Sequence, residues 1–244
     1  MPSAYTLAAA DYDNDGDLDL YATNYSGRAG ERMGARGFEA QAPLPFHDAN
    51  NGGRNALLEN QGDFEFHDVT ERVGLDANNR RFSFSAAWED YDNDGDQDLY
   101  VANDFGRNNL YKNNDGAFVD QASRLKVEDI GAGMSVDWAD CNRDGNMDLY
   151  VGNMFSAAGN RVTFQSQFSE QREEGVVADV QRMARGNSLF LGVEDASFRD
   201  VSLEADVTVG QWAWSSKFVD FNNDGWQDLL VANGYLTNRR PDDL

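Results

Sequence analysis

Aspartates recur in this chain at a spacing that suits the binding of a hard cation. The stretch Asp11-Tyr-Asp-Asn-Asp-Gly-Asp-Leu-Asp19 (loop 1) returns as Asp90-Tyr-Asp-Asn-Asp-Gly-Asp-Gln-Asp98 (loop 2). It returns again as Asp140-Cys-Asn-Arg-Asp-Gly-Asn-Met-Asp148 (loop 3) and Asp220-Phe-Asn-Asn-Asp-Gly-Trp-Gln-Asp228 (loop 4). Positions 1, 3, 5 and 9 offer side-chain oxygens, position 7 can offer its backbone carbonyl, and Gly at position 6 permits a sharp turn. Such oxygen donors suit Ca²⁺, whereas zinc prefers nitrogen or sulfur and Mg²⁺ needs a tighter octahedron.

We therefore predict about four Ca²⁺ sites, one in each loop. The candidate metal-site residues are Asp11, Asp13, Asp15, Asp17 and Asp19; Asp90, Asp92, Asp94, Asp96 and Asp98; Asp140, Asn142, Asp144, Asn146 and Asp148; and Asp220, Asn222, Asp224, Trp226 and Asp228. An EF-hand would close with Glu at position 12, but this chain has Ala or Val there, so the EF-hand interpretation fails.

The alternative for each loop is an acidic, solvated turn that holds no ion. Four copies in register disfavour that alternative, because carboxylates packed so closely repel one another and need a cation. Loops 1 and 2 have Asp at all four side-chain positions, whereas Asn142 and Asn222 replace one Asp in loops 3 and 4. We expect tighter Ca²⁺ binding at loops 1 and 2.

The loops belong to an internal repeat. Each continues into a matching tail, such as Leu99-Tyr-Val-Ala-Asn103, and a second unit recurs as Asn55 to Val69, Asn109 to Asp120 and, more loosely, Asn187 to Val201. A basic period of about 50 residues gains an extra segment in alternate repeats. These inserts cover about 25–54 and 154–186.

Each repeat is typical of four β-strands. Alternating, aromatic-rich segments precede the loops, apolar tails follow them, and the second unit predicts a hairpin. Repeated four-stranded sheets of this length indicate an all-β β-propeller built of four-stranded blades with Ca-binding loops. We expect one domain over 1–244, a partial propeller of three full repeats plus a half blade, with repeats at about 4–70, 82–121, 132–202 and 211–234.

Strand order predicts where the loops and inserts lie. Each aspartate loop joins strands one and two, so it shares a face with the turn between strands three and four, while the inserts emerge opposite. Residues Glu170 to Arg185 of the second insert could form a helix with its apolar side, Val176, Val177, Val180 and Met183, facing the blades. A partner or ligand surface and family-specific packing both stay open for the inserts.

The charge, the hydropathy and the cysteine count of the chain exclude several classes of protein. The 244 residues hold 20 Lys and Arg against 43 Asp and Glu, a net charge of −23, which argues against binding nucleic acid or an anionic membrane. No apolar run is long enough to cross a bilayer, and one cysteine, Cys141, excludes a disulfide framework. We interpret Cys141 as incidental, His67 as structural and His47 as a weak ligand candidate. Four residues are expected in structural or exposed roles: Trp88, Trp138 and Phe218 between blades, and Trp226 at the surface.

The loop together with its Asp-Leu-Tyr-Val-Ala-Asn strand resembles the FG-GAP (VCBS) repeat of integrin α-subunit propellers and many bacterial surface proteins. More narrowly, residues 98–114 and 212–234 resemble the cartilage acidic protein group, whose members often end in an ASPIC/UnbV module. The resemblance implies a propeller, usually of seven blades. No ASPIC/UnbV tail is visible, so we expect either a piece of a longer protein or a half blade completed by another chain.

These observations favour a non-catalytic, calcium-stabilised propeller for extracellular or cell-surface binding or adhesion, with an unidentified protein or glycan ligand. The alternative is a calcium-dependent polysaccharide lyase or hydrolase on the same scaffold. We find no base beside a cation, so we assign no catalytic residue and no enzymatic activity. Calcium loops of this kind imply millimolar Ca²⁺, hence an extracellular, cell-surface or periplasmic location, although no signal is present in this chain.

Overall fold

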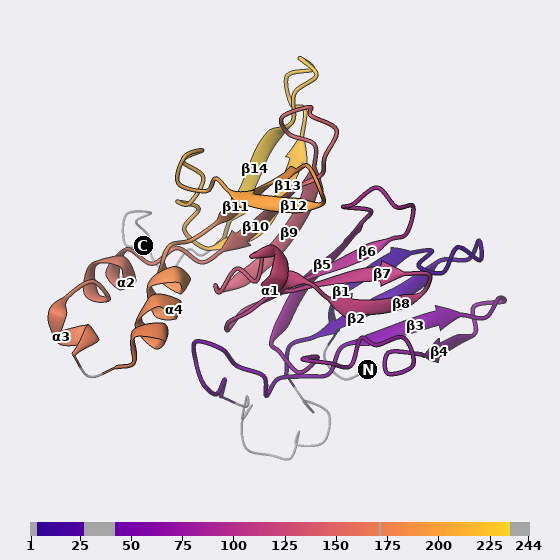
Figure 1. Ribbon diagram of the computed structural model, residues 1–244, viewed down its shortest axis with the longest axis horizontal. Coiled ribbons are helices and arrows are strands. Elements are labelled where there is room, and N and C mark those ends of the chain that lie inside the picture. Colours follow the sequence, from indigo (N-terminus) through magenta and orange to yellow (C-terminus); the bar gives the residue numbers. More distant parts are fainter. Residues whose placement is uncertain (1–3, 27–41, 171, 235–244) are drawn as a thin grey trace.

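The computed structural model describes residues 4–26, 42–170 and 172–234, and these residues form a mainly β structure (Figure 1). Sheet 1 contains β1 (Ala4–Ala10), β2 (Asp19–Asn24), β3 (Ala56–Asn60) and β4 (Phe66–Asp68). Sheet 2 contains β5 (Ser83–Glu89), β6 (Asp98–Asn103), β7 (Asn109–Asn114) and β8 (Ala117–Asp120). Sheet 3 contains β9 (Gly133–Ala139), β10 (Asp148–Asn153), β11 (Ser188–Val193) and β12 (Ser197–Asp200). Sheet 4 is a pair, β13 (Ala213–Val219) and β14 (Asp228–Asn233).

Within each sheet the strands follow one another in chain order and pair antiparallel. The expectation of an all-β chain made of antiparallel four-stranded units is confirmed for sheets 1 to 3. Antiparallel neighbours need only a short connection to join them, and among these sheets only the β2–β3 and β10–β11 connections are long, because they carry the two inserts. No helix among the described residues is long and apolar enough to cross a membrane.

Consecutive sheets pack face to face through three hydrophobic clusters. Leu99 of β6 belongs to the cluster shared with sheet 1, whereas its neighbour Tyr100 belongs to the cluster shared with sheet 3. Successive side chains of a strand point to opposite faces, so β6 and β10 are buried along their whole length. Trp88, Trp138 and Phe218 lie in these clusters, which confirms their assignment to the core between sheets.

A pair of asparagines joins the second and third strands of each complete sheet. The backbone N–H groups of Asn24, Asn103 and Asn153 donate to the side-chain oxygens of Asn55, Asn108 and Asn187 at 2.8, 2.7 and 2.8 Å. The repeat alignment that matched Asn55 with Asn109 is therefore wrong by one residue. Two adjacent asparagines made the sequence ambiguous, and only the hydrogen bond distinguishes them.

The first strand of each sheet has an irregular register near its beginning. One residue without a cross-strand partner stands between paired neighbours: Phe84 in β5, Met134 in β9 and Trp214 in β13. In β1 the register shifts between Ala4 and Leu7, around Tyr5. Such a β-bulge turns the extra side chain out of the regular alternation.

The second insert folds into helices α2 (Ala157–Val162), α3 (Ser166–Ser169) and α4 (Glu174–Ala184), which Figure 1 shows grouped together beside sheet 3; a further short helix, α1 (Ala122–Leu125), follows β8. The predicted helix exists but begins at Glu174 instead of Glu170. Val177 and Met183 are buried, as expected of its apolar side. The helices α2 and α3 were not predicted, because neither carries a buried stripe that the sequence could reveal.

Half of the first insert, residues 27–41, lies outside the described residues. Its last part is attached to the sheet 2 region by Asp48, which accepts hydrogen bonds from Arg81, just before β5, at 2.6 Å and from Arg107, in the loop after β6, at 3.0 Å. Burial raises the pKa of Asp48, but the bonds from these two guanidinium groups outweigh it and hold the pKa below its ordinary value.

Candidate metal centres

All four aspartate loops adopt the same backbone conformation. In loop 1, the carboxylate of Asp11 at position 1 accepts the backbone N–H groups of Asp15 and Gly16 at 3.1 and 3.0 Å. The same two bonds form from positions 5 and 6 in loops 2, 3 and 4, at 2.8 to 3.1 Å. The glycine at position 6 has a φ of +85° to +96°, the conformation for which the sequence predicted glycine.

Position 4 is also left-handed, which the sequence analysis did not foresee. Asn14, Asn93, Arg143 and Asn223 have φ values of 58° to 63°. Three of the four are asparagine, the residue that tolerates this region best after glycine. The asparagine at position 4 of loops 1, 2 and 4 was the feature of the sequence that could have indicated a left-handed residue there.

Position 9 connects each loop to the sheet. The buried carboxylate of Asp98 accepts the N–H of Tyr91 within the loop at 3.3 Å and the N–H of Asn113 in β7 at 2.7 Å. Asp19 and Asp148 make the equivalent pair of bonds, and Asp228 accepts the N–H of Phe221. Burial raises the pKa of Asp98 to about 8 and that of Asp19 to about 6, although these N–H donors lower both.

Position 7 contributes through its backbone. The N–H of each residue there donates to the carboxylate of position 5 at 2.8 to 3.1 Å; the four residues are Asp17, Asp96, Asn146 and Trp226. The side chain of Asp96 instead accepts the N–H of Asp115, in the turn between β7 and β8, at 2.8 Å. This contact shows that the aspartate loop and that turn lie at the same end of the sheet, as strand order predicted.

Loops 1 and 2 bring carboxylate oxygens together. The oxygens of Asp11, Asp13 and Asp15 lie within 4.8 Å of one another, as do those of Asp90, Asp92 and Asp98. In loops 3 and 4, the amide groups of Asn142 and Asn222 donate to Asp144 and Asp224 at 3.0 and 2.9 Å. In these two loops the side-chain amide of the asparagine therefore donates to the carboxylate at position 5 and partly offsets its negative charge.

The oxygens of loop 2 have the surroundings that a cation requires. Asp92 Oδ1 is buried and has no hydrogen-bond partner among the described residues. The ammonium group of Lys112 pairs with Asp92 and lies 2.9 Å from Asp94, so this loop already holds one positive charge. An all-oxygen donor set with an unpartnered buried oxygen fits a hard divalent cation.

Loop 1 differs in the residue that faces it from the third strand. Asn60 and Asn113 make the same bond to position 9, which places Glu59 where sheet 2 has Lys112. Glu59 accepts the hydroxyl of Tyr12 at 2.5 Å and pairs with Arg72. The pKa of Asp13 is raised, mainly by burial and then by the negative charges of Asp15 and Glu59. Loop 1 is therefore the more negative of the two sites.

Neighbouring loops contact each other through positions 4 and 7. Asn14 donates to Asp96 at 3.2 Å, and the guanidinium of Arg143 lies 4.2 Å from the centre of the Trp226 ring. Trp226 is 49% exposed, which confirms its expected place at the surface, and the guanidinium covers part of its ring.

The remaining candidates are one cysteine with a structural contact and two histidines outside the metal-competent clusters of the described residues. The Cys141 thiol donates to Asp148 at 2.9 Å, and burial together with that carboxylate raises its pKa to about 12, which fits an unreactive thiol. His67 is exposed beside Glu65. Neither His67 nor His47 belongs to a metal-competent cluster in the part of the chain that the structure describes.

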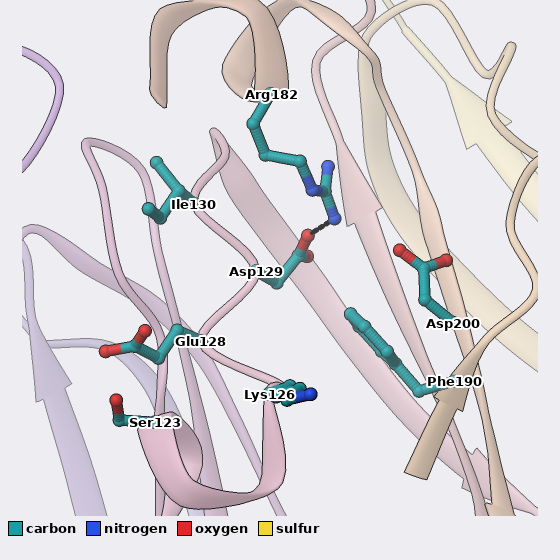
Figure 2. A pocket seen from close by; sticks show the side chains of 8 residues that line it. All are labelled: Ser123, Lys126, Glu128, Asp129, Ile130, Arg182, Phe190 and Asp200. Carbon is teal, nitrogen blue, oxygen red and sulfur yellow. Dashed lines mark hydrogen bonds and ion pairs between the residues drawn. The ribbon is translucent and has the colours of Figure 1, made fainter. Parts of the chain in front are cut away.

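A hollow of about 240 Å³ between α1, α4 and sheet 3 has a polar floor built around the ion pair of Asp129 and Arg182 (Figure 2). The buried carboxylate of Asp129 pairs with Arg182 of α4 and accepts bonds from Ser188 at 2.7 Å and Asn153 at 2.9 Å. This ion pair attaches α4 to sheet 3. We assign the hollow to packing of the insert.

Residues 90–151, from loop 2 to β10, match the family described as the FG-GAP-like repeat. The match contains loops 2 and 3 with the intervening strands, so the expected repeat is confirmed in this segment. No curated protein matches the chain.

Proposed function

We propose that this chain is a non-catalytic, calcium-stabilised β-propeller segment that serves in extracellular or cell-surface binding. The single observation that carries the proposal is the repetition of one loop conformation four times, with carboxylates converging in loops 1 and 2. Repetition argues for permanent ligands, since one catalytic acid–base pair would need only two of these residues.

Face-to-face packing of successive sheets supports the propeller part of the proposal. The sheets are joined through clusters that each combine residues of two neighbours. Each blade of a propeller contacts only its two neighbours, which is the arrangement that these clusters create. The finer kinship with the cartilage acidic protein group remains part of this proposal and is supported by the sequence of residues 98–114 and 212–234.

Calcium would act here as a structural ion. Asp11, Asp13 and Asp15 would hold it in loop 1, and Asp90, Asp92 and Asp98 in loop 2, where it would neutralise carboxylates that otherwise repel one another. Loops of this type bind Ca²⁺ in the rough range 10⁻⁴–10⁻³ M in extracellular modules, which motivates the proposed location outside the cytoplasm.

The test is a thermal melt in 10 mM Ca²⁺, in 10 mM Mg²⁺ and in chelator. At roughly 10 to 100 times the dissociation constant, each occupied site adds about 1.4 to 2.7 kcal/mol to the free energy of unfolding. For a chain of this size each such site raises Tm by at least about 3 °C. An unchanged Tm in Ca²⁺ would refute the structural-ion proposal, and an equal rise in Mg²⁺ would refute its selectivity.

Binding is proposed in preference to catalysis because the carboxylates recur in four loops of one conformation, more than an acid–base pair needs. A panel of acidic and neutral polysaccharides, incubated with the protein in Ca²⁺ and in chelator, tests this part. Calcium-dependent turnover of any of them would replace the binding proposal with the lyase or hydrolase alternative.

A further inference from the structure

A cavity of about 510 Å³ lies at the end of the sheets away from the aspartate loops. Its walls come from the beginnings of β1, β5, β9 and β13, the loop after β6, and the second insert. The volume is in the range of small-molecule sites, which is about 300–1,000 Å³. None of its lining residues belongs to an aspartate loop, so the inference below does not rest on calcium.

The β-bulges place equivalent residues of the repeats in this cavity. Tyr5, Phe84, Met134 and Trp214 all line it, and each stands at the irregular position of the first strand of its sheet. The ring centres of Tyr5 and Phe84 are 4.9 Å apart, and those of Phe84 and Trp214 are 5.7 Å apart. Three sheets therefore contribute a continuous arc of aromatic side chains.

The rest of the wall is formed by the inserts. Val180 and Met183 of α4 line the cavity from one side, and Phe46 of the first insert lines it beside Phe105, with ring centres 5.1 Å apart. The two inserts thus line the same cavity. The sequence left open whether the inserts pack against the blades or form a surface for a ligand, and their shared cavity favours a ligand surface.

One carboxylate faces this aromatic wall. Asp104 lines the cavity, and its Oδ2 accepts the hydroxyl of Tyr25 at 2.5 Å. No described residue bonds Oδ1, and no Lys, Arg or His is among the described lining residues. Burial raises the pKa of Asp104, while the Tyr25 hydroxyl lowers it. A positive charge inside the cavity would compensate the carboxylate that burial disfavours.

We propose that this cavity binds a small organic cation of the alkylammonium class, held by the aromatic faces of Tyr5, Phe84 and Trp214 and by the carboxylate of Asp104. Aromatic faces attract cations through their quadrupole, and quaternary ammonium groups are bound in this way by aromatic cages. The apolar wall accommodates alkyl substituents, which a bare metal ion or a sugar would not require. Selectivity for positive charge comes from Asp104.

Calorimetry with choline and its uncharged isostere 3,3-dimethyl-1-butanol tests the inference on the whole chain in Ca²⁺. We expect saturable binding of choline and at least about tenfold weaker binding of the alcohol. Asp104→Asn keeps an oxygen for the Tyr25 hydroxyl and should weaken choline about tenfold without changing the affinity for the alcohol. Glu71→Gln, an exposed carboxylate outside the cavity, removes the same charge and should change neither affinity.

Phe84→Leu provides a second variant in case Asp104→Asn lowers stability. It keeps the wall apolar but removes one aromatic face, so choline should bind several-fold more weakly while the alcohol is unaffected. Equal binding of choline and the alcohol would show an apolar site without charge selection and overturn the proposal. The absence of saturable choline binding would also overturn it, while the Ca²⁺ melt still reports on the aspartate loops independently.

Discussion

We expect Lys112 to lower the calcium affinity of the proposed site in loop 2, so replacing it with glutamine should raise that affinity. Its ammonium group pairs with Asp92 and Asp94, two candidate ligands, and its side chain is 24% exposed. The lysine therefore occupies part of the negative potential that a Ca²⁺ ion would use. It also stabilises the loop when no ion is bound.

The magnitude follows from Coulomb's law. Two unit charges 4 Å apart interact by about 1 kcal/mol in water and about 4 kcal/mol at the effective dielectric near a protein surface. A divalent ion doubles these values, but a partly exposed lysine can turn toward solvent and avoid most of the repulsion. We expect Lys112→Gln to strengthen Ca²⁺ binding at loop 2 by about 2 kcal/mol, roughly thirtyfold.

Calcium titration by calorimetry and thermal melts in chelator measure the two consequences. In chelator, Lys112→Gln should lower the free energy of unfolding by about 1 kcal/mol, because Asp92 and Asp94 lose their counter-charge. Glu59→Gln is the matched control in sheet 1, where removal of a negative charge should weaken loop 1. An unchanged affinity in Lys112→Gln would refute this reasoning.

Three further predictions concern stability. Gly95→Ala should lower the free energy of unfolding by about 1 to 2 kcal/mol, and this loss comes from its φ of +96° alone because an added Cβ meets no atom within 4 Å. Gly175→Ala in α4 should instead raise the free energy of unfolding by roughly 0.5 to 1 kcal/mol. Thermal melts that shift equally for the two variants would contradict the strain argument. Asp48 has a depressed folded-state pKa, so its contribution is present above about pH 4 and is lost as pH falls through the folded-state value. Acid unfolding of Asp48→Asn should accordingly show a smaller loss of stability below about pH 4 than the parent, and identical acid profiles would exclude this role. Asp129→Asn should destabilise by about 3 kcal/mol in urea unfolding because it leaves the half-buried Arg182 without its ion pair. Adding Arg182→Met should restore part of that loss, and a double variant less stable than the single one would count against this reasoning.

The repeat itself was readable from the sequence because its signals are local. Position 6 of each loop favoured glycine, and the apolar tails after loops 1 to 3 favoured burial on both faces, so these loops and strands followed from neighbouring residues alone; the tail after loop 4, β14, is largely exposed. The side of α4 that packs was equally predictable from its periodicity. The start of that helix and the existence of α2 and α3 were not, since nothing in their composition separates them from a polar loop.

Only the tertiary structure decided what surrounds each feature. Asn108 could be told from Asn109 only through its bond to Asn103, because register depends on a partner strand. Lys112 and Glu59 acquired their opposite effects on loops 2 and 1 only when the third strand placed them there. The sequence by itself determined the spacing of the aspartates, because ligand spacing is a property of consecutive residues. The cavity was decided by the fold, because its aromatic residues come from separate repeats and meet only when the sheets pack against one another.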